Sequence, residues 1–225
     1  PYDWVGRLTF TPDSKRLIYV VLTGRSYYIV GWDRKDTQGI LYDQIEGIVI
    51  SPDSKHIAYK AMREKSWHVV IDGHMSQPYL HVDDLTFSPD SNHFFYVAGT
   101  QTGSVVVLDG KEGNKKYTYL YTTSRGPRTY GFRGMFSKDS KYLLYIGGNR
   151  ENSNNQLYLV INDIATKLDG IIYHPTFSPD AQSILYGIDK WQATPRELWW
   201  NTVPTPANVQ PLGGSVKDLD AKSPL

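Results

Sequence analysis

The sequence predicts an all-β fold built from copies of one short unit, and three observations lead to this prediction. A five-residue phrase, apolar–Ser/Thr–Pro/Lys–Asp–Ser/Ala, returns five times, and we call it the turn motif; its copies begin at Phe10, Ile50, Phe87, Phe136 and Phe177. A Tyr follows nine residues after each start, and the copies are 40, 37, 49 and 41 residues apart. That period is the length of one β-propeller blade, so we predict a β-propeller of four-stranded antiparallel blades.

The third copy shows how one blade is expected to fold. Its strands are predicted at 84–87, 94–98, 105–108 and 117–121. The turn motif joins the first two strands, because Pro89 has the φ that the first corner requires and Asp90 can bond back to nearby amides. Asp109-Gly110 predicts a tight hairpin after the third strand, since both residues tolerate positive φ.

The other copies follow the same plan and divide the chain. Third strands are predicted at 27–30, 69–71, 157–161 and 198–200, and no segment has a helical period of useful length. We predict one domain over 1–215 and a tail at 216–225. The blades are expected at 5–44, 45–82, 83–121, 133–173 and 174–213. Five copies predict a complete five-bladed ring or, as the alternative, a fragment of a larger ring.

Composition excludes several classes of partner and site. The 24 Lys and Arg residues nearly balance 23 Asp and Glu residues, so the net charge of +1 gives no electrostatic reason to expect nucleic-acid binding. No apolar run is long enough for a membrane-spanning helix. The chain has no cysteine, which excludes disulfides, thiolate metal sites and a cysteine nucleophile.

The turn motif resembles a repeat of known bacterial proteins. Phe87-Ser-Pro-Asp-Ser and the Tyr that follows are similar to the Phe-Ser-Pro-Asp-Gly signature of TolB-type WD40-like propellers. The sequence departs from that signature where Ser or Ala181 replaces Gly and Lys138 replaces Pro. The resemblance covers about residues 5–212 and implies a β-propeller that binds a protein partner in the periplasm or outside the cell.

Residues that return in every blade are expected to build the blade. We therefore predict that the motif Asp residues cap turns and that the motif Tyr residues pack between blades. Turns between first and second strands, and between third and fourth strands, lie on one face, which we call the motif face. Turns between second and third strands, and the connections between blades, lie on the opposite, variable face. They are predicted at 23–26, 62–66, 99–103, 147–156 and 189–197 as irregular loops that can recognise a partner.

The longest connection between blades, 122–133, carries a basic and aromatic cluster. Arg125, Arg128 and Arg133 with Tyr130 could bind a carboxylate or phosphate through bidentate hydrogen bonds. A solvated loop is the alternative, in which the arginine stems cover apolar surface. Trp191, in a loop of the fifth blade, is a candidate for stacking on a sugar or a peptide ring.

Two histidines are candidates near the centre of the propeller. His81 and His174 are predicted just before a first strand, near where a central channel would open, together with Asp83 and Asp84. Two imidazoles from separate blades could bind a metal, whereas single histidines at strand ends usually make surface hydrogen bonds. The spacing of the histidines matches no known metal motif, so we predict no metal site, no cofactor and no catalytic residue.

The resulting prediction is a non-enzymatic binding scaffold. Its variable face would contact a protein or peptide, with a glycan as another possible ligand. The alternative is an enzyme with a site in the channel, similar to metal-dependent polysaccharide lyases or to the propellers attached to peptidases. Self-association into an oligomer is a third possibility, because tyrosine-rich strand edges can join neighbouring molecules.

Overall fold

The computed structural model describes residues 2–31, 41–120, 134–151, 154–190 and 198–204. Within these ranges every regular element is a β-strand, and neighbouring strands pair antiparallel. The same ranges contain no helix of the length and apolarity needed to cross a lipid bilayer. The predicted all-β class is confirmed.

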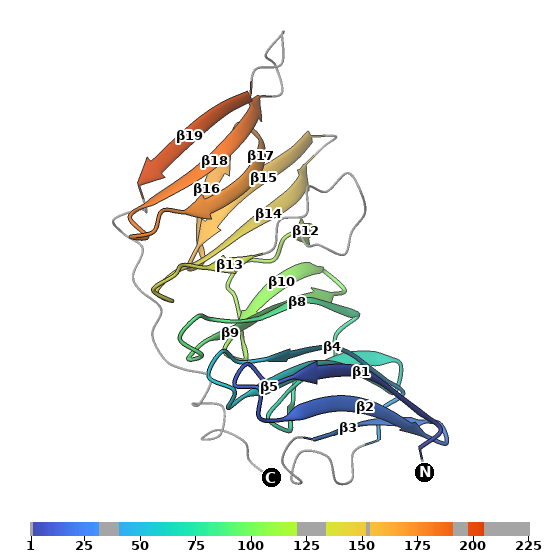
Figure 1. Cartoon of the computed structure of the whole chain (residues 1–225). Helices are drawn as coiled ribbons and strands as arrows, with labels where there is room; N and C mark the ends of the chain where they lie inside the picture. Colours follow the sequence, from blue (N-terminus) through green and yellow to red (C-terminus); the bar gives the residue numbers. More distant parts are fainter. Residues whose placement is uncertain (1, 32–40, 121–133, 152–153, 191–197, 205–225) are drawn as a thin grey trace.

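The strands form five sheets, which we number as blades 1 to 5 from the N-terminus (Figure 1). Blade 1 contains β1 (Trp4–Phe10), β2 (Leu17–Thr23) and β3 (Ser26–Val30). Blade 2 contains β4 (Gln44–Ile50), β5 (Ile57–Arg63), β6 (Ser66–Ile71) and β7 (His74–Met75). Blade 3 contains β8 (His81–Phe87), β9 (Phe94–Thr100), β10 (Gly103–Leu108) and β11 (Lys111–Glu112).

Blades 4 and 5 complete the described part of the chain. Blade 4 contains β12 (Tyr119–Leu120), β13 (Met135–Phe136), β14 (Leu143–Glu151), β15 (Asn154–Ile161) and β16 (Ile164–Leu168). Blade 5 contains β17 (Gly170–Phe177), β18 (Ser183–Lys190) and β19 (Leu198–Pro204). In blades 1, 2, 3 and 5 the described strands follow one another as a meander, as the repeat predicted, whereas in blade 4 both β12 and β13 pair with β14.

The end of blade 3 differs from the prediction. We expected 117–121 to be its fourth strand, but β11 pairs with β10 and Tyr117 makes only an isolated bridge to Ser104. Tyr119–Leu120 pairs instead with β14 of blade 4, and β13 pairs with another part of β14. The chain therefore leaves blade 3 earlier than the spacing suggested, because the Asp109-Gly110 turn is followed at once by the short return strand.

The turns between second and third strands are also tighter than predicted. We expected irregular loops at 23–26, 62–66 and 99–103, but Thr23 pairs with Ser26, Arg63 with Ser66 and Thr100 with Gly103. Each turn thus has only two residues. Glu64 and Lys65 both have positive φ, 52° and 66°, which is the geometry that suits the twist of a hairpin. Variation in sequence at these turns does not mean variation in length.

The apolar core lies between the blades rather than within any one of them. Four clusters of buried side chains join blade 1 to 2, 2 to 3, 3 to 4 and 4 to 5. The motif tyrosines of the last four blades face the preceding blade and are buried, as predicted; they are Tyr59, Tyr96, Tyr145 and Tyr186. The Tyr145 hydroxyl donates a hydrogen bond to Asp163 Oδ1 over 2.9 Å.

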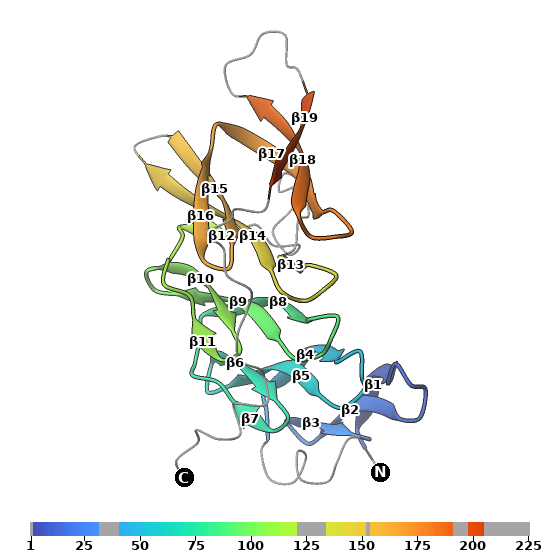
Figure 2. The same ribbon diagram turned by 90° about the vertical axis from the view of Figure 1, so that its left-hand side faces the viewer.

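The five blades form an open stack in the described structure. Blade 1 and blade 5 lie at opposite ends of it (Figure 1). The view in Figure 2 places the first strands β1, β4, β8 and β13 along one side of the stack, and the short fourth strands β7, β11 and β16 along the other. We call the first-strand side the inner side, because first strands line the axis of a propeller. No sheet among the described strands joins blade 5 to blade 1.

Candidate functional site

The motif aspartates cap their own turns, as the sequence predicted. In each copy the Ser or Thr hydroxyl donates to Oδ1 of the Asp two residues later, over 2.5 to 2.6 Å. The same Oδ1 accepts the amide N–H two residues beyond the Asp, as Asp90 does from Asn92 at 3.0 Å. Burial opposes the charged form of Asp90, but the bonds from Ser88 and Asn92 outweigh it and lower the pKa of Asp90 to about 2.

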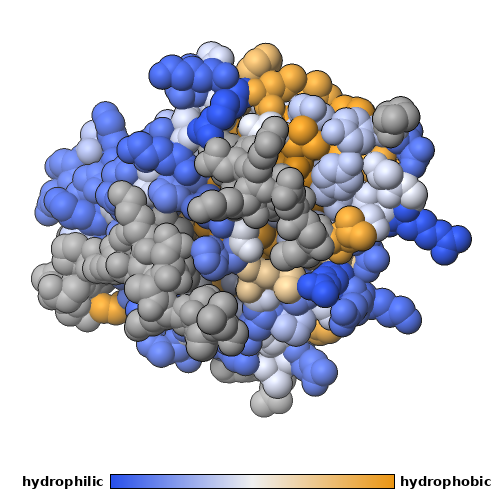
Figure 3. All heavy atoms as spheres, turned by 90° about the horizontal axis from the view of Figure 1, so that it is seen from below, coloured by the Kyte–Doolittle hydropathy of each residue, from blue (hydrophilic) through white to orange (hydrophobic). Residues whose placement is uncertain are grey.

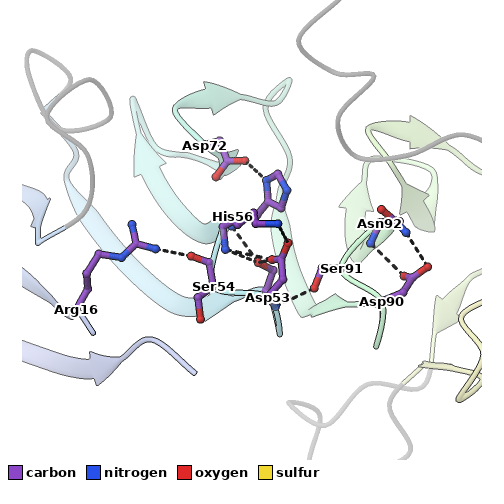
Figure 4. A network of polar contacts seen from close by, with 10 residues as sticks. Arg16, Asp53, Ser54, His56, Asp72, Asp90, Ser91 and Asn92 are labelled. Atoms are coloured by element: carbon purple, nitrogen blue, oxygen red, sulfur yellow. Dashed lines mark hydrogen bonds and ion pairs between the residues drawn. The ribbon is translucent and has the colours of Figure 1, made fainter. Parts of the chain in front are cut away.

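The motif also joins neighbouring blades, which the sequence did not reveal. The backbone amide of the motif Asp donates a hydrogen bond to a serine hydroxyl in the next blade. That serine is the fifth residue of the next copy of the motif. Asp13 N donates to Ser54 Oγ at 3.0 Å, and Asp90 N donates to Ser140 Oγ at 3.1 Å. Figure 4 shows the equivalent bond from Asp53 N to Ser91 Oγ, at 3.0 Å. The serines are nearly fully buried.

A second repeated contact connects the two turns of the motif face. His56 Nδ1 lies 2.6 Å from Asp72 Oδ2, and His93 Nδ1 lies 2.8 Å from Asp109 Oδ2. The other carboxylate oxygen of Asp109 accepts the Phe94 amide at 2.8 Å. Asn162 takes the same role in blade 4, where its Oδ1 accepts the Leu143 amide.

The histidines of these turns also contact the following blade. The His56 ring lies 6.3 Å from the Phe87 ring, centroid to centroid, at 30°. His93 lies 6.4 Å from Phe136 at 28°. The Asp109 hydrogen bond raises the pKa of His93, although burial works against it. These polar groups of the motif face are thus engaged in turns and in contacts between blades.

The first strands carry a feature that differs from blade to blade. The pairing of β1, β4, β8 and β17 with the second strand shifts at one equivalent place, a β-bulge. The bulge residue stands three positions before the motif's first residue, and Arg7, Gly47 and Asp84 all have positive φ there: 52°, 59° and 53°. Such backbone costs energy in a non-glycine residue and re-aims the neighbouring side chains.

The bulge positions, their neighbours and the strand paired with β4 carry mixed charges. We call Arg7, Glu46, Lys60, Asp83 and Asp84 the inner row. Arg7 Nη2 lies 3.8 Å from Glu46 Oε1, and Lys60 Nζ lies 3.5 Å from Glu46 Oε2. Lys60 is held further by the Trp67 ring, whose centroid is 5.6 Å from Nζ. Charge along the row runs from the cation in blade 1, through the paired Glu46 and Lys60, to two half-buried carboxylates in blade 3.

Two of the predicted site residues correspond to these bulge positions. His174 holds the place of Asp84 in β17, and the sequence places Arg133 three residues before Phe136. Arg125, Arg128, Tyr130, Arg133 and Trp191 all lie outside the described residues. Sequence reasoning missed the bulge, although an isolated glycine in a strand pattern, Gly47, is a signal that could have indicated it.

His81 lies at the start of β8 and is half-buried. Its imidazole lies directly over Gly99 of the neighbouring strand, where the absence of a side chain leaves room for the ring. His81 and His174 belong to blades 3 and 5, and blade 4 lies between them (Figure 1). Among the described residues no group of three or more His, Asp or Glu is placed to hold a metal ion.

No family model matches the sequence, and no curated protein matches it either. Solved structures with a similar fold include TolB from Acinetobacter baumannii, at 15% identity and a TM-score of 0.42, over 95% of this chain and 55% of TolB. The β-propeller domain of the trilobed protease from Pyrococcus furiosus is 15% identical with a TM-score of 0.49, over 98% of this chain and 74% of that one.

A third similar structure is the Pyrococcus horikoshii acylaminoacyl peptidase, at 14% identity and a TM-score of 0.44. It is matched over 88% of this chain and 38% of its own. The chain therefore spans about half the length of the TolB structure and much less of the peptidase. At these identities the likeness concerns the fold alone.

Proposed function

We propose that this chain is a non-enzymatic scaffold that binds a protein or peptide along the inner row. The observation that carries the proposal is that polar residues repeated in every blade hold the fold together, whereas the residues at the bulge position differ between blades. The motif Asp and Ser residues bond to turns and to the next blade, whereas the bulge position holds a different residue type in neighbouring blades. A binding surface for one particular partner needs such unrepeated positions on a rigid frame.

The charges of the inner row indicate the chemistry of the partner. Arg7, 46% exposed at its side chain, can receive an acidic group of the partner. Asp83 and Asp84, two blades away, can receive a basic group. An extended peptide with one acidic and one basic side chain would complement these charges, and its affinity should fall as salt screens the charges. The resemblance of the turn motif to TolB-type repeats supports a periplasmic or secreted location.

A peptide library displayed on phage and selected on the immobilised protein tests the proposal. We expect the enriched peptides to carry a basic residue, and Asp83→Asn to weaken their binding by about tenfold, or about 1.4 kcal/mol. Arg7→Ala should weaken peptides that carry an acidic residue in the same way.

The matched control is Lys141→Ala, which removes an exposed charge from the motif face. We expect this variant to bind the selected peptides like the wild type. Enrichment of no peptide, or binding that survives both inner-row substitutions but is lost in Lys141→Ala, would place the site elsewhere.

A further inference from the structure

The outer edge of blade 4 differs from the outer edges of blades 2 and 3. A protein surface mostly offers side chains to a partner, and at the lower end of the stack hydrophobic side chains lie among hydrophilic ones (Figure 3). The last strand of a sheet also offers backbone N–H and C=O groups, and a strand of another molecule can pair with them. A regular edge strand is therefore a surface for association.

In blades 2 and 3 the outer edge is interrupted. β7 and β11 have two residues each, and regular pairing then stops until Tyr79 and Tyr117 bridge back to the third strand. Pro78, which has no N–H group, stands before Tyr79, and Lys115 and Lys116 stand before Tyr117. Short strands, proline and lysine are features that keep edge strands from pairing with other molecules.

In blade 4 the same edge is continuous. β16 pairs with β15 at every position from Ile164 to Leu168, without an extra residue. Among the strands that the structure describes, β15 is its only neighbour. Thr166 and Lys167 are exposed near the middle of the strand. Of the features that interrupt the edges of blades 2 and 3, β16 has one lysine.

The hairpin that begins β16 determines the direction of its backbone groups. Asn162 and Asp163 form a two-residue turn in which both residues have positive φ, 45° and 66°. Ile161 and Ile164, on either side of this turn, face each other and form a hydrogen-bonded pair. Bonded and non-bonded pairs then alternate along an antiparallel ladder.

The alternation leaves two residues of β16 with backbone groups that point outward. Ser76 in blade 2 holds the place of Thr166, and its N–H donates to Val69 O of the third strand at 2.8 Å. The backbone groups of Thr166 accordingly point to β15, and those of Ala165 and Lys167 point away from it. Within the described residues, no backbone hydrogen bond joins this side of β16 to another element.

We propose that β16 of one copy pairs antiparallel with β16 of a second copy. Thr166 faces Thr166 across the two-fold axis, Ala165 of each copy faces Lys167 of the other, and Ile164 faces Leu168. Each pair of Ala165 with Lys167 then exchanges both of its backbone hydrogen bonds. The pairing lies on the side of the stack away from the first strands, so the inner row remains free (Figure 2).

The partner is a second copy because this register makes the strand complementary to itself. Lys167 faces the small side chain of Ala165, and it stands between Asp169 of its own chain and Asp163 of the second copy. A threonine pair directly across two strands is favourable. A register centred on Lys167 would instead place two lysines opposite each other, which is unfavourable.

Opposite charges at the exposed Thr166 test the pairing. In analytical ultracentrifugation we expect the wild type to dimerise with rising concentration. Thr166→Lys and Thr166→Glu should each weaken dimerisation by about tenfold or more, because each places like charges opposite each other. An equal mixture of the two variants should dimerise more tightly than either alone. Circular dichroism checks that both variants are folded.

The control is Lys111→Glu, which changes an exposed charge on the edge of blade 3. This variant should dimerise like the wild type. A wild type that stays monomeric at its highest soluble concentration overturns the proposal. So does a mixture of Thr166→Lys and Thr166→Glu that associates no better than the separate variants, or a Lys111→Glu variant that also loses dimerisation.

The absence of cysteine in the chain allows a second test, of the register. Thr166→Cys, oxidised with diamide, should form a disulfide-linked dimer on a non-reducing gel. A non-bonded pair has its Cα atoms about 4.5 Å apart, within the range of a disulfide. Lys167→Cys is the matched control, because its two cysteines lie diagonally across the pair and should cross-link much less. Equal yields from the two variants, or no dimer from Thr166→Cys, overturn the proposal.

Discussion

At the scale of single residues, the turn motif performs two tasks at once. The carboxylate of the Asp closes its own turn, and the amide of the same residue donates to a serine of the next blade. A motif that only closed turns would tolerate Asn, Gly or Ala after the Asp. The buried hydroxyls of Ser54, Ser91 and Ser140 explain why Ser stands there in place of the Gly of similar repeats.

Substitutions at the fifth residue of the motif, which accepts the hydrogen bond between blades, should have opposite effects on stability in two blades. Ser91→Ala leaves the Asp53 amide without its acceptor and should cost about 1 kcal/mol of unfolding free energy. In the contact between blades 4 and 5 the equivalent residue is Ala181, which is buried and has no hydroxyl. Ala181→Ser should therefore stabilise the protein by about 1 kcal/mol. Urea unfolding measures both changes, and an Ala181→Ser variant less stable than the wild type would contradict this assignment.

The His93–Asp109 pair predicts a dependence of stability on pH. The folded protein holds the pKa of His93 above its ordinary value, through the Asp109 hydrogen bond first, against burial, and with a further contribution from the charge of Asp90. The stabilising contribution of the pair is thus complete below the unfolded pKa, about 6.5. It is lost as pH rises through the folded pKa.

We expect His93→Gln to destabilise the protein more at about pH 5.5 than at about pH 9. Urea unfolding at the two pH values measures the difference. Ser91→Ala is the control, because its hydrogen bond joins groups that do not titrate in this range, so its cost should be equal at both. A cost of His93→Gln that does not change with pH would contradict the charged pair.

At the scale of elements, one sequence position has different surroundings in different blades. The first residue of the turn motif ends a first strand and packs on the preceding blade in blades 2 to 5. In blade 1 it is exposed. The first strand also contains the bulge, which bends it and gives the inner row its unrepeated side chains.

Phe87 and Phe10 form a matched pair for this element. Phe87→Ala removes a buried ring that packs on Phe94 at 4.6 Å and should cost about 3 to 5 kcal/mol of unfolding free energy. Phe10→Ala should change it by less than about 0.5 kcal/mol in the dilute, monomeric protein. Urea unfolding compares the two. An equal cost for both would mean that blade 1 is covered in solution even at low concentration.

At the scale of the whole molecule, the proposed binding residues and the contacts that hold the stack together are separate. The inner row belongs to the first strands and to the strand paired with one of them, whereas the apolar clusters lie between neighbouring blades (Figure 2). Substitutions in one should therefore leave the other intact: Asp83→Asn should weaken peptide binding without disturbing the contacts between blades.

The sequence by itself determined most of the strands, the motif turns and the role of the motif aspartates. These features depend on neighbours within a few residues: Pro89 sets φ, Asp90 bonds two residues ahead, and Asp109-Gly110 reverses the chain. The buried motif tyrosines were also predictable, because a residue repeated in every blade must serve the contact that every blade makes.

Only the tertiary structure decided which turns contact one another, which charged residues lie side by side and which blade faces are exposed. Asp53 and Ser91 are 38 residues apart, and their hydrogen bond depends on how two twisted sheets pack. The bulge at Arg7 and Asp84 depends on the register between strands, which composition does not reveal. Blade 1 and blade 5 have the same motif as the others, and their exposure follows only from their place at the ends of the stack.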